Sequence, residues 1–138
     1  MSPDDDAVRA RTRSAVGASA VVLALLGLAL LFAGAELTGA ALGTPLPEPI
    51  AGVMGAAFLG FASMNWIARH NLLGGIYGRA VVAANQTHFT IGAIVLAKHL
   101  LASGGPAGLW LLVSIYAAGA AFFTLLLRGT GVPRRAPG

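Results

Sequence analysis

Four long apolar runs constrain this chain more than any other feature. They cover residues 15–35, 50–68, 77–101 and 107–127. Each run is about the length that an α-helix needs to cross a hydrocarbon core of roughly 30 Å. We therefore predict an all-α, multi-pass transmembrane four-helix bundle.

The composition supports a single domain that lies in the membrane. The 138 residues are 57% hydrophobic and 10% charged, whereas a soluble domain carries about 25% charged residues. Four spans leave no length for a separate soluble unit. We expect one integral membrane domain over residues 1–138, with cytoplasmic tails at 1–13 and 129–138. Frequent Ala, Gly and Arg with a single Lys further suggest a bacterial origin.

The basic residues predict the orientation of the chain. Four crossings place every arginine on one face of the membrane: Arg9, Arg11, Arg13, Arg69, Arg79, Arg128, Arg134 and Arg135. The other face has only Lys98 as a cation, beside Glu36 and Glu48. Because cytoplasmic loops carry the excess of Lys and Arg, both termini are expected in the cytoplasm. The predicted location is the plasma membrane, which in a bacterium is the inner membrane. Partners of these cations are then anionic lipid headgroups, not nucleic acid.

The segments around the first run have their own patterns. Residues 1–7 are acidic and are expected to form a short disordered tip. The first apolar run could belong to a cleaved signal peptide, but it exceeds the 7–15 residues typical of such a core, which favours a retained helix. Residues 43–49 hold three prolines, so an extended connector is expected there.

Small residues predict a packing face on the second span. Gly52, Ala56 and Gly60 lie four residues apart, so they share one helix face and allow close approach of another helix. The Gly104-Gly105-Pro106 turn makes the third and fourth spans antiparallel neighbours.

The third span carries most of the polar side chains in the apolar runs. They are Arg79, Asn85, Gln86, Thr87, His88, Thr90, Lys98 and His99. At about 100° per residue they form two polar faces. Arg79, Gln86 and Thr90 share one face, and Asn85, His88 and His99 share the other. This helix is thus expected to be the most enclosed of the four, or to border a second protomer.

A candidate polar pocket follows from the depth of these groups. Polar groups far inside a membrane are costly and indicate function by default. The predicted pocket consists of Arg79, Asn85, Gln86, His88 and Asn65. Within the chain, the expected partners are Asn65 on the second span and Ser114, Tyr116 or Thr124 on the fourth. Alternatively, these side chains only cross-link helices by hydrogen bonds.

A second candidate site lies where the third span begins. Arg69 and Arg79 flank a glycine-rich segment that includes Gly74, Gly75 and Gly78. Backbone N–H groups at a helix start, together with two guanidinium groups, could bind an anion or a lipid headgroup. The alternative is that the glycines only form a tight loop.

Several chemistries are disfavoured by the sequence. There is no Cys, which excludes disulfides and thiolate sites. His88 and His99 lie on one helix, roughly 16 Å apart along its axis, so they are poorly placed to ligate one haem. No carboxylate accompanies them for a metal site. We expect no catalytic residue, no metal and no cofactor.

The sequence leaves three classes of function open. The first is a structural or accessory subunit or a homo-oligomer, whose partner is itself or another membrane protein. The second is a small transporter or a lipid- or anion-binding protein that uses the polar pocket. A membrane-embedded enzyme is the third and weakest. A transporter predicts activity that changes near pH 6–7, where His88 would titrate.

Overall fold

The computed structural model describes residues 3–70 and 76–128. Its helices are α1 (Pro3–Phe32), α2 (Gly34–Leu42), α3 (Glu48–Ala68), α4 (Ile76–Ser103) and α5 (Ala107–Leu127). No strand occurs among these residues. The four long helices α1, α3, α4 and α5 are each long and apolar enough to cross a membrane. The prediction of an all-helical chain with four apolar spans is confirmed.

The start of the chain and the first connection differ from the sequence-based expectation. Helix α1 begins at Pro3, so the acidic tip expected to be disordered is helical from that residue on. Helix α1 ends at Phe32, before the predicted end of the first apolar run at residue 35, and the short helix α2 follows after a bend at Ala33. The extended connector is shorter than predicted, because α3 begins at Glu48 with Pro49 in its first turn, a position that proline tolerates.

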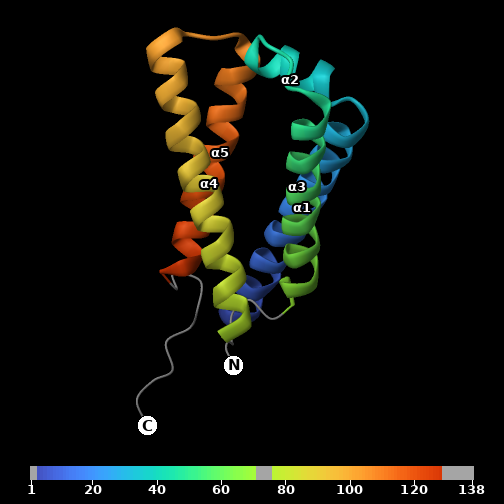
Figure 1. The fold of residues 1–138 in the computed structure, drawn as a ribbon. Coiled ribbons are helices and arrows are strands. Elements are labelled where there is room, and N and C mark those ends of the chain that lie inside the picture. Colours follow the sequence, from blue (N-terminus) through green and yellow to red (C-terminus); the bar gives the residue numbers. More distant parts are fainter. Residues whose placement is uncertain (1–2, 71–75, 129–138) are drawn as a thin grey trace.

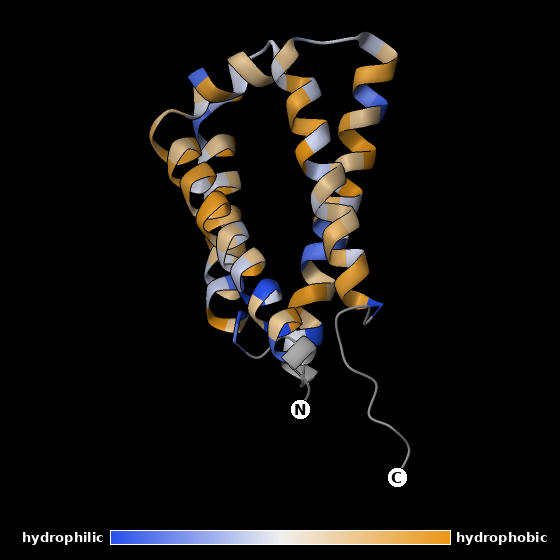
Figure 2. Ribbon diagram, turned by 180° about the vertical axis from the view of Figure 1, so that it is seen from behind, coloured by the Kyte–Doolittle hydropathy of each residue, from blue (hydrophilic) through white to orange (hydrophobic). Residues whose placement is uncertain are grey.

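The four long helices form two antiparallel pairs. Figure 1 shows α1 beside α3 and α4 beside α5, with α2 running across one end between the two pairs. The pairs approach each other at the end where α1 begins and α5 ends, and they spread apart toward α2. Hydrophobic residues dominate all four long helices (Figure 2). The site described below lies between these pairs.

Two glycines bring α1 and α3 into close contact. A Cβ atom at Gly27 would lie 2.8 Å from the carbonyl oxygen of Gly55, and a Cβ at Gly55 would lie 2.7 Å from the carbonyl oxygen of Gly27. Such distances leave room for hydrogen only, so both positions require glycine. A Cβ at Gly34 would likewise meet the Cβ of Ala51 at 2.5 Å.

The predicted small-residue face of α3 is therefore not the one that packs against α1. Added Cβ atoms at Gly52 and Gly60 would meet nothing within 4 Å, and Ala56 is exposed. The actual contact uses Ala51 and Gly55, one position earlier in each case. Contact of the Gly52, Ala56 and Gly60 face with another protein stays a prediction.

Aromatic side chains fill the contact between α4 and α5. Gly119 admits the ring of Phe89, and Gly92 admits the ring of Tyr116, since a Cβ at either position would overlap these rings. The ring of Phe89 also stacks on Phe123 at 5.6 Å. Helix α4 ends at a turn in which Gly104 has a φ of 67°. The expected antiparallel pairing of these helices is confirmed.

Helix α4 is less enclosed than its polar side chains suggested. Only 17% of the residues in its most apolar stretch are buried, compared with 33% in α1. Within this chain α4 is therefore not the most enclosed helix, and the alternative that it borders a second protomer stays a prediction. The exposed side of α4 faces lipid or another protein.

Candidate functional site

A pair of asparagines connects the two helix pairs. Asn65 of α3 donates from Nδ2 to Oδ1 of Asn85 on α4 at 3.0 Å, and Asn85 donates back to Oδ1 of Asn65 at 2.6 Å. The second donors bind Ser19 Oγ on α1 and the carbonyl oxygen of Val81. Both side chains are fully buried. Asn65 was the partner expected for this part of the third span.

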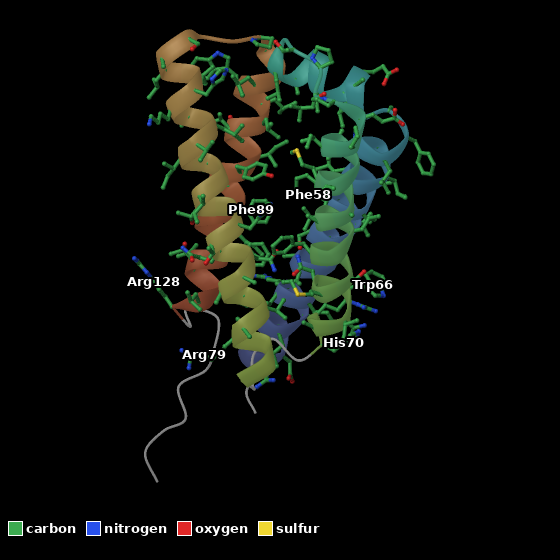
Figure 3. All side chains as sticks on the ribbon, viewed as in Figure 1. Phe58, Trp66, His70, Arg79, Phe89 and Arg128 are labelled. Carbon is green, nitrogen blue, oxygen red and sulfur yellow. The ribbon has the colours of Figure 1, made fainter. Side chains whose placement is uncertain are left out.

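Toward α2 from this asparagine pair, His88 lies within an aromatic cluster. We define the cluster as Phe58, Phe61, His88, Phe89 and Tyr116. The imidazole centroid lies 4.6 Å from that of Phe61 and 5.6 Å from that of Phe58. Its Nε2 atom is 3.3 Å from the hydroxyl oxygen of Tyr116, another expected partner. Figure 3 shows Phe58 and Phe89 pointing into the space between the helix pairs.

A cavity of about 550 Å³ extends from the aromatic cluster toward α2. Side chains of all five helices line it, for example Leu30, Leu42, Met54, Val95 and Leu112. The volume lies within the range of about 300–1,000 Å³ that small-molecule sites occupy. The lining is almost wholly apolar, which suits a hydrocarbon.

The polar residues of the lining are few. They are Thr38, Thr87, His88 and Tyr116, and none of the lining residues is charged. The hydroxyl of Thr38 donates to the carbonyl of Gly34 at 2.7 Å and accepts from the amide of Leu46 at 2.9 Å. Thr38 thereby fixes α2 to the connector. The hydroxyl of Thr87 and the pair His88 and Tyr116 remain for a ligand.

A second, smaller cavity of about 230 Å³ lies between α1 and α5. It shares Leu26, Phe58 and Tyr116 with the larger cavity and is bounded on its other side by residues such as Ser19 and Phe123. The aromatic rings thus separate two apolar spaces. Buried residues of both helix pairs nevertheless form one core cluster, in which Phe58 of α3 joins Phe89 of α4 and Tyr116 of α5.

The predicted polar pocket divides into separate groups. Asn65, Asn85 and His88 face the neighbouring helices, as described above. Gln86 instead donates from Nε2 to the hydroxyl of Thr90 on its own helix at 3.1 Å. Arg79 is exposed near the start of α4 (Figure 3). Neither Arg79 nor Gln86 lines a cavity with His88.

The predicted anion site is described only in part. Arg69 lies over the ring of Trp66, with its guanidinium carbon 3.6 Å from the ring centroid, and donates to the carbonyl oxygen of Trp66. Partial dehydration, and then the positive charges of Arg13 and Arg69, lower the pKa of His70 below its ordinary value. Gly74 and Gly75 lie outside the described residues. Anion binding at Arg69 and Arg79 stays a prediction.

The sequence analysis missed the apolar wall of the site. Phe58, Phe61 and Phe89 enclose His88, yet they were not singled out. The phenylalanines at 58 and 61 lie three residues apart and so share a helix face, which is a usable signal. Helix α2 was missed as well, although it supplies one end of the cavity.

The arrangement can hold an uncharged, mainly apolar molecule. His88 and Tyr116 can form hydrogen bonds with a polar group of that molecule. Among the described residues no group of three or more His, Asp or Glu could hold a metal ion. The expected lack of a cofactor or a catalytic residue stays a prediction. A comparison with protein-family models, curated proteins and solved structures finds no match to this chain.

Proposed function

We propose that this protein binds apolar or amphipathic molecules inside the membrane, in the cavity between its two helix pairs. The observation that supports this most is the cavity itself, with about 550 Å³ of space between spans and an apolar lining. The sequence also allowed a ligand-binding protein whose site is formed by the polar residues of α4. We place the site instead in the apolar cavity beside His88.

The way into the cavity also supports this function. Ile91 and Val95 line the cavity and are 56% and 60% exposed. We infer that the cavity opens to the surroundings beside these two residues. In a membrane those surroundings are lipid. A hydrophobic molecule can therefore enter sideways from the bilayer, without crossing the polar interface.

Photolabelling in phosphatidylcholine vesicles tests this proposal. The probe is a long-chain alkane with a diazirine group, and labelled residues are mapped by peptide mass spectrometry on the full chain. We expect strong labelling of cavity residues such as Leu112. Ala41→Phe fills the cavity, because Ala41 lines it, and should at least halve that labelling.

Ala40→Phe is the matched control, since Ala40 is exposed on the same helix and does not line the cavity. It should leave the labelling of Leu112 unchanged. Equal labelling of Leu112 in both variants and in the wild type would contradict the proposal.

A structural role as a homo-oligomer or an accessory subunit is the second candidate. It is supported by the α3 face of Gly52, Ala56 and Gly60, which is open to the surroundings and permits close helix approach. Ala56→Leu should reduce chemical cross-linking between chains in membranes. Ala118→Leu, the same change at an exposed position of α5, should not. An equal yield of cross-linked chains in the two variants would oppose this role.

For either function we infer a four-helix unit with both termini in the cytoplasm, in the plasma membrane of a bacterium. The support is the distribution of arginines at the end of the helices where α1 begins and α5 ends. Arg69, Arg79 and Arg128 are candidates for contact with anionic headgroups at that surface.

A further inference from the structure

Along α4, the lining of the large cavity changes from polar to apolar. On α4, the lining begins at Thr87 and His88 and continues through Ile91 to Val95 and Leu96. Val95 follows His88 by seven residues, which is about 10 Å of helix. Tyr116 of α5 joins His88 at the polar end. A ligand with one polar end and an apolar tail matches this gradient.

The hydrogen-bonding capacity of His88 and Tyr116 selects the type of polar group. Their mutual bond uses Nε2 and the phenol oxygen. Nδ1 of His88 has no hydrogen-bond partner among the described residues. Because no buried side-chain nitrogen or oxygen of these residues lacks a partner, Nδ1 must be accessible. If Nδ1 carries the proton, the pair offers Nδ1–H as donor and the phenol oxygen as acceptor. If Nε2 carries it, the pair offers the phenol O–H as donor and Nδ1 as acceptor.

Nδ1 and the phenol oxygen point in different directions, so one ligand group bonds to only one of them. Each of these atoms donates in one tautomer and accepts in the other. A hydroxyl group can donate and accept, so it forms a bond at either atom in both tautomers. A carbonyl can only accept, so at either atom it bonds in one tautomer only, and an alkane end forms no bond. Of these groups, a hydroxyl fits best.

The charge of the lining restricts the ligand further. None of the lining residues is Lys, Arg, Asp or Glu. An ionised carboxylate or phosphate moved into such surroundings would lose its hydration without a charged partner, which is expensive. The cavity therefore favours an uncharged head group.

We infer that the ligand is an uncharged lipid alcohol, with its hydroxyl bonded to Nδ1 of His88 or to the phenol oxygen of Tyr116 and its hydrocarbon chain directed toward α2. This inference rests on the proposed function and specifies its ligand class. It concerns the head group only, so it can fail while the proposed function stands.

Competition with the alkane photoprobe in the same phosphatidylcholine vesicles tests whether the site prefers an alcohol. The competitors are hexadecanol, hexadecane and hexadecanoate, at matched membrane concentrations and at a pH where the carboxylate is ionised. Hexadecanol should protect Leu112 from labelling at a roughly three- to tenfold lower concentration than hexadecane, the range that one hydrogen bond supplies. Hexadecanoate should protect least.

Two variants test whether the preference for hexadecanol depends on His88 and Tyr116. Tyr116→Phe keeps the ring and removes the hydroxyl, and His88→Phe keeps an aromatic ring without nitrogen. The double variant should reduce the advantage of hexadecanol over hexadecane to less than twofold, and the single variant that removes the bonding atom should have the same effect. Ser114→Ala is the control, because it removes a hydroxyl of α5 that binds the Trp110 carbonyl and lies outside the cavity lining.

The outcomes separate the two claims. Equal protection by all three competitors, or the best protection by hexadecanoate, would overturn the alcohol inference and leave the binding cavity in place. An advantage of hexadecanol that survives in the Tyr116→Phe, His88→Phe double variant would also overturn it. Labelling of Leu112 that Ala41→Phe does not reduce would instead remove the proposed function.

Discussion

At the residue scale, Asn65 and Asn85 hold the two helix pairs together. Each amide donates to the other and to one further group, Ser19 Oγ for Asn65 and the Val81 carbonyl for Asn85. In apolar surroundings an unpaired amide is costly, so each asparagine requires its partner. This reciprocal pair positions α4 against α3 one turn before His88.

Removing one member of the pair should destabilise the protein more than removing both. Asn85→Leu leaves Asn65 with unpaired buried groups, and we expect a loss of about 1–2 kcal/mol in the free energy of unfolding. The Asn65→Leu, Asn85→Leu double variant should recover part of that loss. Unfolding in detergent measures both values.

Gln86→Leu is the matched control, because the Gln86 amide binds only Thr90 of its own helix. Its effect should be smaller than that of Asn85→Leu. If the effects of the two asparagine variants simply add in the double variant, the reciprocal pairing is not what stabilises this contact.

Individual polar contacts were more predictable from the sequence than the cavity was. Asn65 and Tyr116 were named as partners because few polar groups are available inside a membrane. The depth argument placed Gln86 in the pocket, yet Thr90, four residues along its own helix and on its predicted face, satisfies it. The apolar wall was missed, since side chains that face lipid and side chains that face a cavity have the same composition.

At the scale of helices, close packing depends on which small residue faces the neighbour. Gly27 and Gly55 bring the backbones of α1 and α3 together. Spans were predictable from length and hydropathy alone. The packing face was not, because a span rich in Ala and Gly has small residues on several faces and its sequence does not say which one meets a helix.

Alanine substitutions distinguish these faces. Gly55→Ala places a Cβ 2.7 Å from the Gly27 carbonyl oxygen, so the helices must separate, and we expect a loss of about 1–3 kcal/mol. Gly60→Ala meets open space and should be neutral or stabilise by up to about 1 kcal/mol, because alanine favours the helix.

Thermal unfolding of the two variants in one detergent measures the difference. Equal midpoints for Gly55→Ala and Gly60→Ala would contradict the observed contact between α1 and α3.

At the scale of the whole molecule, two helix pairs and the bridging α2 enclose a space that a closely packed bundle would fill. The four spans were predictable, but this arrangement was not. Helix α2 was not predicted, because it lies mostly beyond the first apolar run, which was expected to end at residue 35. Its Thr38 anchors it to the connector, a contact between distant residues that local patterns do not contain.

The orientation is testable because the chain has no cysteine. Thr44→Cys lies in the exposed connection between α2 and α3, and Ala10→Cys is exposed near the start of α1. A membrane-impermeant maleimide should label Thr44→Cys in intact bacterial spheroplasts and label Ala10→Cys only after permeabilisation. Labelling of Ala10→Cys in intact spheroplasts would contradict cytoplasmic termini.

The central claim is that the cavity between the helix pairs holds an uncharged amphiphile. Native mass spectrometry of the full chain, released from its membrane in mild detergent, tests it most directly. We predict an added mass, identified as an uncharged lipid alcohol after extraction, on the wild type and on Ala40→Phe but absent from Ala41→Phe. A bare wild-type chain, or the same added mass on all three proteins, would contradict the account.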